Sequence, residues 1–231
     1  MRQPNPRSDG KRHIGVVASY DFTRREELRR WFPPDAEWTL TFTEEVPYRD
    51  NLELVSRLGR TGLLAGPVRG LVERGAETVG YLCAACSFVG GVSGERALRE
   101  AILSYGARQA LTTSGAVVDA LRAVGARRVA VVHPYQEPVD RLLAAYLTAS
   151  GFDVVALTAL GLDTVEDVYT VQEQQVVDTV VRGDHAQADA VFISCTTLPT
   201  YDALPLLEER LGKPVISANQ ATAWALLGGA P

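Results

Sequence analysis

Three cysteines are the side chains with the clearest capacity for chemistry in this sequence of 231 residues. Cys83 and Cys86 lie three positions apart in the stretch GYLCAACSF, whereas Cys195 lies far away in VFISCTTL. A thiolate is a strong nucleophile and a base, and a thiol can donate a proton. The stretch around Cys83 therefore allows three interpretations: a redox pair, a metal clamp, or one reactive thiol beside an inert cysteine.

The residues around the Cys83–Cys86 pair favour the third interpretation. A thioredoxin-type motif usually has Gly-Pro or similar residues between its cysteines, whereas this sequence has Ala84 and Ala85. A zinc site needs about four ligands, and neither Cys195 nor the three histidines have metal-ligand spacing to the pair. We therefore expect Cys83 to be reactive, Cys86 to be a small buried hydrophobe, and no metal ion to be bound.

The elements that position these cysteines follow from the alternation of apolar, β-branched runs with helical patterns, which is typical of parallel sheets. In the first half, the pattern predicts strands at 13–19, 38–46, 78–83 and 108–113, with helices near 23–32, 51–74 and 94–105. In the second half, it predicts strands at 127–134, 152–160, 189–195 and 213–218, with helices near 136–149, 165–182 and 202–211.

The two halves match each other in order and in detail. GVVASY corresponds to AVVHPY, which pairs Tyr20 with Tyr135, and GAETVGYLC corresponds to QADAVFISC, which pairs Cys83 with Cys195. LTTSGAVVDAL corresponds in the same way to ISANQATAWAL. We therefore predict an α/β protein of two pseudo-symmetric lobes, each a four-stranded parallel sheet flanked by helices. The expected division is a disordered lead-in at 1–12, a first lobe at 13–117 plus 215–231, and a second lobe at 118–214.

The repeat places Cys83 and Cys195 at the carboxyl ends of equivalent strands, and ligands of open parallel sheets bind outside those ends. If the lobes face each other, the two sulfur atoms look into one cleft from opposite sides. Nearby backbone N–H groups would lower the thiol pKa from its reference value of ~8.5. Such a pair suits proton transfer or addition at a small planar carbon centre. The alternative is two buried structural cysteines.

Polar groups beside the strand ends supply the expected substrate contacts. The hydroxyl group of Tyr135 could donate to a substrate carboxylate, and its counterpart Tyr20 either does the same or caps a core. Hydroxyl and amide side chains could form an anion cradle with backbone N–H groups, although such residues are also ordinary helix N-caps. The residues that we expect to bind substrate are Tyr135, Ala84, Ala85, Ser19, Thr196, Ser87 and Asn219.

Composition excludes several classes of function. The chain is 46% hydrophobic and 22% charged, and no apolar run approaches the ~20 residues that span a membrane. A net charge of -5 favours neither nucleic acid nor an anionic membrane as a partner. Cysteines without an export signal favour the cytoplasm. No GxGxxG or GxxxxGK[ST] motif opens a helix, so no cofactor is expected. The sequence leaves open whether the protein forms a homodimer or a homotetramer.

Several of these residues resemble those of a known family. They are the cysteine at a strand end in each half, HPY at 133–135, and SCTTLPTYDALPLLEERLGKPVISANQATAWAL at 194–226. They are similar to the aspartate/glutamate racemase superfamily, and most similar to its branch of maleate cis-trans isomerases and arylmalonate decarboxylases. The resemblance covers 13–227. It implies two pseudo-symmetric lobes, cofactor-free chemistry where they meet, and a carboxylate substrate.

The resemblance also implies roles for single residues. Cys83 matches the attacking thiolate of maleate isomerase, Cys195 matches the proton donor, and Tyr135 matches a tyrosine that hydrogen-bonds a substrate carboxylate. Arylmalonate decarboxylase has glycine at the position of Cys83, so the presence of both cysteines favours an isomerase or racemase. We expect a cofactor-independent isomerase or racemase of a small (di)carboxylate. The alternatives are decarboxylation of a malonate-type acid and non-catalytic binding of a small acid.

Three departures from the family pattern concern the substrate. Maleate isomerases carry an asparagine after the first strand, where this sequence reads SYDF at 19–22. A second family asparagine falls near DTVED at 163–167, which contains none. The Thr-Ser pair of the decarboxylase is Ala84-Ala85 here. The resemblance therefore supports the chemistry more strongly than it supports any particular substrate.

Overall fold

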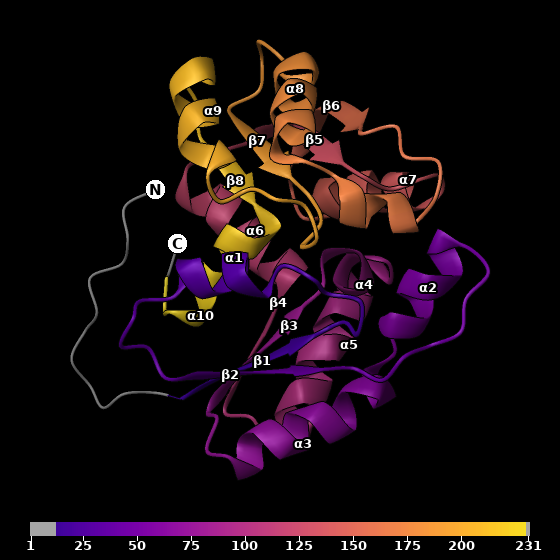
Figure 1. Ribbon diagram of the computed structural model, residues 1–231, viewed down its shortest axis with the longest axis vertical. Coiled ribbons are helices and arrows are strands. Elements are labelled where there is room, and N and C mark those ends of the chain that lie inside the picture. Colours follow the sequence, from indigo (N-terminus) through magenta and orange to yellow (C-terminus); the bar gives the residue numbers. More distant parts are fainter. Residues whose placement is uncertain (1–12, 230–231) are drawn as a thin grey trace.

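Two four-stranded parallel sheets form the framework of the protein (Figure 1), in a computed structural model that describes residues 13–229. The first sheet has the order β2-β1-β3-β4 and the second has the order β6-β5-β7-β8. The strands are β1 (Ile14–Ala18), β2 (Trp38–Phe42), β3 (Thr78–Leu82), β4 (Gln109–Thr112), β5 (Arg128–His133), β6 (Asp153–Ala159), β7 (Ala190–Ile193) and β8 (Val215–Ser217). The identical strand order confirms the predicted fold class. The predicted lead-in at 1–12 lies outside the described residues.

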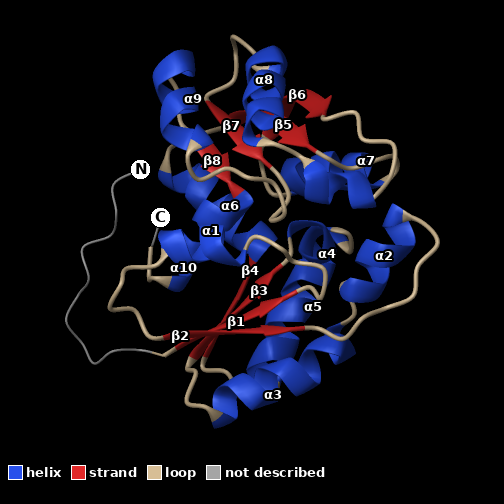
Figure 2. Ribbon diagram, in the orientation of Figure 1, coloured by secondary structure: helices blue, strands red, loops and turns tan. Residues whose placement is uncertain are grey.

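Helices cover both faces of each sheet (Figure 2). They are α1 (Arg25–Trp31), α2 (Asn51–Leu58), α3 (Ala65–Glu73), α4 (Ala84–Phe88), α5 (Gly91–Ser104), α6 (Thr113–Ala123), α7 (Val139–Ala149), α8 (Glu173–Gly183), α9 (Ala203–Leu211) and α10 (Ala218–Leu226), with 3₁₀ turns η1 (Thr61–Leu64) and η2 (Glu166–Thr170). Within residues 13–229, no helix has the length and apolar character needed to cross a membrane.

The inner strands β1, β3 and β7 are buried along their whole length. A parallel sheet covered on both faces requires this, because its strands have no solvent-facing side. The edge strands β2 and β6 are partly exposed instead. Each sheet therefore fixes the carboxyl ends of its central strands within a rigid apolar layer.

The chain crosses between the two lobes near its C-terminus, and this changes the predicted division. Strand β8 pairs with β7 in the second sheet, so the first-lobe segment cannot begin at 215 as predicted. Helix α10 follows β8 directly and packs against β3 of the first sheet and against α6. At Gly80 in β3, a Cβ atom would lie 2.9 Å from Leu226 of α10, so glycine allows this close approach.

The helices differ from the prediction in several places, among them the stretch near 165–182, which is divided into η2 and α8. The single helix predicted at 51–74 is divided into α2, η1 and α3, since α2 ends at Gly59, where a Cβ atom would lie 2.8 Å from the carbonyl oxygen of Cys86. Helices α6 and α10 were not predicted. They begin at equivalent N-caps, where Thr112 accepts a hydrogen bond from the Gly115 N–H and Ser217 accepts one from the Gln220 N–H.

Candidate functional site

A small cavity of about 60 Å³ lies where the carboxyl ends of the two sheets meet. Cys83 follows β3 of the first sheet and Cys195 follows β7 of the second, and both line this cavity. The structure therefore brings together the two cysteines that the internal repeat pairs. The residues that line it are Ser19, Asp21, Asn51, Leu54, Val55, Leu58, Cys83, Ala84, Ala85, Cys86, Pro134, Tyr135, Val165, Val168, Tyr169, Cys195, Thr196 and Thr197.

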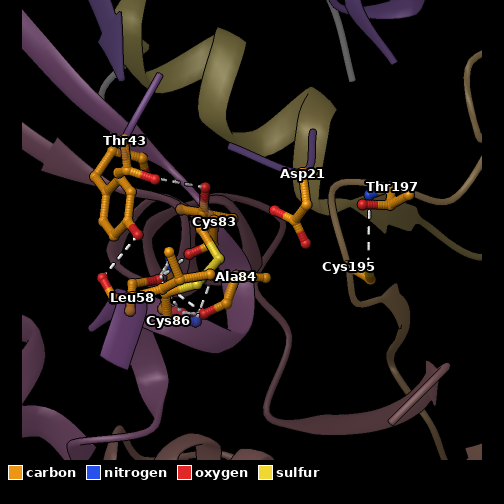
Figure 3. Close-up of a disulfide and its surroundings, with 12 residues drawn as sticks. Asp21, Thr43, Leu58, Cys83, Ala84, Cys86, Cys195 and Thr197 are labelled. Carbon is orange, nitrogen blue, oxygen red and sulfur yellow. Dashed lines mark hydrogen bonds between the residues drawn. A yellow bond between two sulfur atoms is a disulfide. The ribbon is translucent and has the colours of Figure 1, made fainter. Parts of the chain in front are cut away.

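Cys83 and Cys86 form a disulfide in this structure (Figure 3). Helix α4 begins directly after Cys83, and its first turn brings the two Cα atoms within 5.5 Å of each other. Cys86 is buried, as expected, but it is the bonded partner of Cys83, which corrects its interpretation as an inert, unbonded side chain. A sulfur atom in a disulfide cannot act as a thiolate. Nucleophilic chemistry at Cys83 thus requires prior reduction of this bond.

Cys195 is a free thiol on the other side of the cavity. Its sulfur accepts a hydrogen bond from the Thr197 N–H at 3.4 Å. Its backbone has a φ of 95°, a conformation that L-residues rarely adopt and that often marks functional sites. Burial raises the pKa of the Cys195 thiol to about 11 and outweighs the lowering by the Thr197 N–H. The expected lowering of the thiol pKa is therefore wrong for Cys195, which holds its proton at neutral pH.

Tyr135 lies beside Cys195 in the second lobe, after strand β5. Its hydroxyl group lies 3.1 Å from the Ser194 hydroxyl, and Phe88 of α4 packs edge-on against its ring. Burial and the neighbouring Cys195 raise the pKa of Tyr135 well above its ordinary value. The phenol therefore stays protonated and can serve as a hydrogen-bond donor in the cavity. Its internal counterpart Tyr20 is not among the residues that line the cavity.

Three polar residues of the cavity, namely Asp21, Asn51 and Tyr169, were not predicted. Asp21 lies in the turn after β1, in which the Phe22 N–H donates to the Ser19 carbonyl. Its carboxylate projects toward the space between Cys83 and Cys195 (Figure 3). The Tyr169 hydroxyl, from the 3₁₀ turn η2 of the second lobe, donates to Asp21 Oδ2 at 3.0 Å. The SYDF stretch was noted in the sequence only as a departure from the family pattern.

The predicted substrate-binding residues divide into two groups. Tyr135, Ala84, Ala85, Ser19 and Thr196 line the cavity, whereas Ser87 and Asn219 lie behind it. The Ser87 hydroxyl contacts the carbonyl oxygens of Cys83 and Ala84, at 2.8 and 2.9 Å. The Asn219 amide donates to the Thr196 carbonyl at 2.9 Å. Ser87 and Asn219 therefore position the backbone that carries the cavity, because their side chains are used by that backbone.

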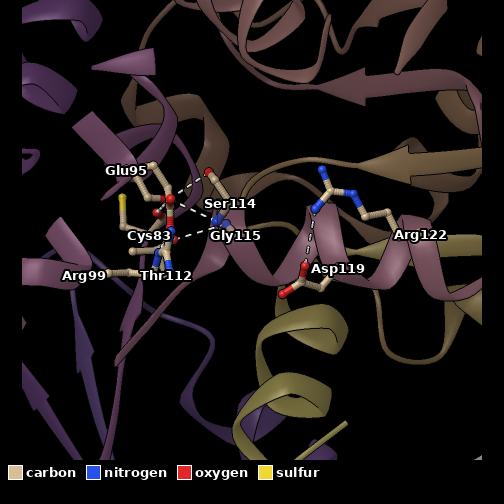
Figure 4. Close-up of polar contacts among 9 residues, drawn as sticks. Cys83, Glu95, Arg99, Thr112, Ser114, Gly115, Asp119 and Arg122 are labelled. Carbon is tan, nitrogen blue, oxygen red and sulfur yellow. Dashed lines mark hydrogen bonds and ion pairs between the residues drawn. The ribbon is translucent and has the colours of Figure 1, made fainter. Parts of the chain in front are cut away.

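A second polar network supports the first-lobe side of the cavity (Figure 4). The carboxylate of Glu95, which is only 4% exposed, accepts hydrogen bonds from Thr112 at 2.6 Å and from Arg99 at 2.8 Å. Gly115 lies against it, since a Cβ atom there would be 2.8 Å from Glu95 Oε1. The network ties α5 to the start of α6 beside Ser114, whose hydroxyl donates to the Ala84 carbonyl at 3.0 Å.

Part of the cavity lining is apolar, and it consists of Leu54, Val55, Leu58, Val165 and Val168. A larger groove of about 1140 Å³ lies between α1, β2 and α10 and contains none of the three cysteines. Within residues 13–229, no three His, Cys, Asp or Glu side chains gather in a way that could hold a metal ion. The small cavity is therefore the place where reactive side chains converge.

Two lobes of identical strand order, with a cysteine from each at one cavity, define a protein of the aspartate/glutamate racemase-like superfamily. The chain belongs to the arylmalonate decarboxylase family, whose model matches residues 61–230. Arylmalonate decarboxylase of Bordetella bronchiseptica is 35% identical over 68% of this chain and 66% of that protein. Maleate isomerase of Nocardia farcinica is 32% identical over 94% of this chain and 90% of that protein.

Solved structures of both kinds of enzyme share the fold. Unliganded arylmalonate decarboxylase superposes with a TM-score of 0.81 and 28% identity, and covers 95% of this chain and 93% of its own. Nocardia farcinica maleate cis-trans isomerase gives a TM-score of 0.83 with 26% identity, and covers 94% of this chain and 92% of its own. The comparisons thus place the chain within one branch that contains an isomerase and a decarboxylase.

Proposed function

We propose that the protein is a cofactor-independent isomerase or racemase of a small carboxylate, similar to maleate cis-trans isomerase. The supporting observation is the convergence of Cys83 and Cys195, from equivalent strand ends of the two lobes, on one cavity. A relative supports covalent chemistry, because a cysteine-to-serine mutant of the Nocardia farcinica isomerase carries a covalently bound succinylcysteine intermediate.

In the isomerase reaction, reduced Cys83 adds as a thiolate to one carbon of an activated double bond. A carbon–sulfur bond forms, the π electrons move toward the adjacent carbon, and Cys195 gives that carbon its proton. The adduct then has a single bond about which it can rotate. The Cys195 thiolate removes the proton again, the carbon–sulfur bond breaks, and the alkene leaves with changed geometry. A thiol with a pKa of about 11 is suited to the donor step, because it is protonated when the substrate binds.

In the racemase reaction, one thiolate removes the proton next to a carboxyl group and the opposite thiol returns a proton on the other face. The Tyr135 hydroxyl stabilises the enediolate-like charge that develops between the two steps. Racemisation exchanges the α-proton with solvent. Deuterium uptake at the α-carbon therefore distinguishes racemisation from rotation of an adduct, which does not require such exchange.

Both reactions require a reductant, since Cys83 is bonded to Cys86. A dithiol such as dithiothreitol supplies two electrons and two protons, giving two protein thiols and an oxidised, cyclic dithiothreitol. We expect isomerase or racemase activity only in the reduced protein.

Decarboxylation of a malonate-type acid is the second candidate, and one observation favours it. Cys195 is the one free thiol among the three cysteines of the chain, and protonation of a decarboxylated enediolate needs only one thiol. The family model and the Bordetella bronchiseptica relative support the same reaction. The Ala84-Ala85 pair disfavours it, because it offers no side-chain donors to the enediolate that remains when carbon dioxide leaves.

The test is a screen of maleate, aspartate, hydantoins and substituted malonates with reduced and oxidised protein. For an isomerase or racemase, we expect turnover only after reduction and its loss in Cys83→Ala, whereas the matched variant Cys86→Ala keeps activity. Release of carbon dioxide by Cys83→Ala would instead identify a decarboxylase. If no compound is turned over, and if all thiols are alkylated slowly and substrate protects none of them, the protein only binds small acids.

A further inference from the structure

One carboxylate oxygen in the cavity is left without a partner. Asp21 Oδ2 accepts the hydrogen bond from Tyr169, whereas Asp21 Oδ1 is buried and has no hydrogen-bond partner. A buried polar atom is normally paired, and a carboxylate oxygen can only accept. Because Asp21 faces the space between Cys83 and Cys195 (Figure 3), a bound ligand is well placed to supply the missing donor.

The charges around the cavity also favour a ligand that donates a hydrogen bond to Asp21. The described residues that line it include no lysine, arginine or histidine. Arg24 lies close in sequence, but its guanidinium donates to the backbone carbonyls of Thr197 and Val171. Burial, and after it the nearby carboxylates of Asp21, Glu45 and Glu166, raise the pKa of Tyr20. A ligand with two carboxylates would therefore place a negative charge near Asp21, the one charged residue among the described residues that line the cavity, with no basic side chain there to offset it.

We infer that Asp21 selects a small monocarboxylate that carries an N–H donor, an amide or an ammonium group, in the place of a second carboxylate. This inference rests on the proposed function, because it assigns the substrate class of the same site. Tyr135 donates to the single carboxylate, the N–H group donates to Asp21 Oδ1, and the reacting carbon lies between Cys83 and Cys195. The position of Asp21 agrees with the loss of the family asparagine from the turn after β1.

The test compares maleate with maleamate, its cis monoamide, which has the same carbon skeleton and one carboxylate fewer. Affinities are measured by calorimetry in the Cys83→Ala background, in which no covalent adduct forms at that residue. We expect maleamate to bind about tenfold to a hundredfold more tightly than maleate, because a hydrogen bond to a charged group is among the stronger ones. Adding Asp21→Asn should remove this preference, since an asparagine can also donate to a carboxylate.

Glu166→Gln is the matched control, because it removes one negative charge from the same region without touching the cavity lining. It should leave the ratio of the two affinities nearly unchanged. The inference is overturned if maleate and maleamate bind equally, if Asp21→Asn leaves their ratio unchanged, or if neither compound binds.

Turnover of the same two compounds by the reduced protein with Cys83 intact separates this inference from the proposed function. Conversion of maleamate to its trans isomer, at a kcat/KM at least tenfold above that for maleate, supports both. A binding preference that depends on Asp21, without conversion of either compound, would support the substrate class while rejecting the isomerase proposal.

Discussion

The ends of strands β3 and β7 occupy equivalent places in the two lobes, yet their cysteines are in different chemical states. After β3, helix α4 begins at once and its first turn brings Cys86 to Cys83, which ends in a disulfide. After β7, no helix follows until Ala203, and Cys195 is a free thiol with a φ of 95°. The internal repeat therefore fixes where the sulfur atoms lie, whereas the segment after each strand decides what each sulfur can do.

The largest expected effect comes from the free thiol. Cys195→Ala should lower kcat by at least about 10³-fold in every reaction considered, because each needs a proton from the second lobe. Steady-state kinetics on the reduced protein checks this, with circular dichroism to show that the fold is kept. Retention of more than a tenth of the activity would show that Cys195 is not the proton donor.

The next effect concerns the bonded pair. Cys86→Ala should make activity independent of reductant, because Cys83 then has no adjacent thiol with which to form a disulfide. The wild-type protein should gain at least about tenfold on treatment with dithiothreitol, through the thiolate that reduction frees. Rates measured with and without dithiothreitol for both proteins test whether the dependence on reductant comes from the Cys83–Cys86 disulfide. An equal gain in both proteins would place the reductant's effect elsewhere.

A smaller effect concerns the pH at which the thiol after β7 ionises. In the double variant Cys83→Ala/Cys86→Ala, absorbance at 240 nm should titrate with a pKa near 11 for the Cys195 thiol, once the change measured in the same variant with Cys195→Ser added is subtracted to remove tyrosine ionisation. This pKa is above the unfolded value of ~8.5, so the folded state holds the proton more tightly. The resulting stability is present below pH ~8.5 and is lost as pH rises through about 11. A titration midpoint at or below 8.5 would contradict the burial of this thiol.

The smallest effect concerns the packing behind β3. Gly80 aligns with Phe192 in the internal repeat, and it makes room for Leu226 of α10. Gly80→Ala should lower the free energy of unfolding by ~1–2 kcal/mol through overpacking, and Leu226 can yield in part because the contact is with its methyl groups. Urea unfolding measures the loss. In a Leu226→Ala background the same change should cost less, and an unchanged cost would show that the two positions do not interact.

Most of the fold was predictable because the internal repeat is clearest in the sequences of the strands. All eight strands were expected, and their alternation of apolar runs with helical patterns is a strong signal in a parallel sheet. Helices α6 and α10 escaped prediction because they are buried on several sides, so that small and apolar residues occur without the 3.6-residue period that identifies a surface helix. The break at Gly59 lies where the backbone runs so close to the carbonyl oxygen of Cys86 that a Cβ atom would clash with it, and no local pattern reveals this.

The site was predictable where it follows from strand ends, which accounts for Cys83, Cys195 and Tyr135. It was not predictable where it depends on contacts between the lobes. Asp21 meets Tyr169 across 148 positions of sequence, and neither residue has a pattern that marks it as polar lining. The pairing of Cys83 with Cys86 depends on the first turn of α4, and the two-alanine spacing alone did not favour it over an inert Cys86.

The return of α10 to the first lobe has a consequence for how substrate enters. The polypeptide passes between the lobes twice, once through α6 and again between β8 and α10, and these two helices are packed against each other. A hinge that swung the lobes apart would have to shear that pair and pull Leu226 away from Gly80. We therefore expect substrate to enter through the segments around Tyr48 and Asp21, whose hydrogen bonds to Glu166 and Tyr169 join the two sides of the cavity.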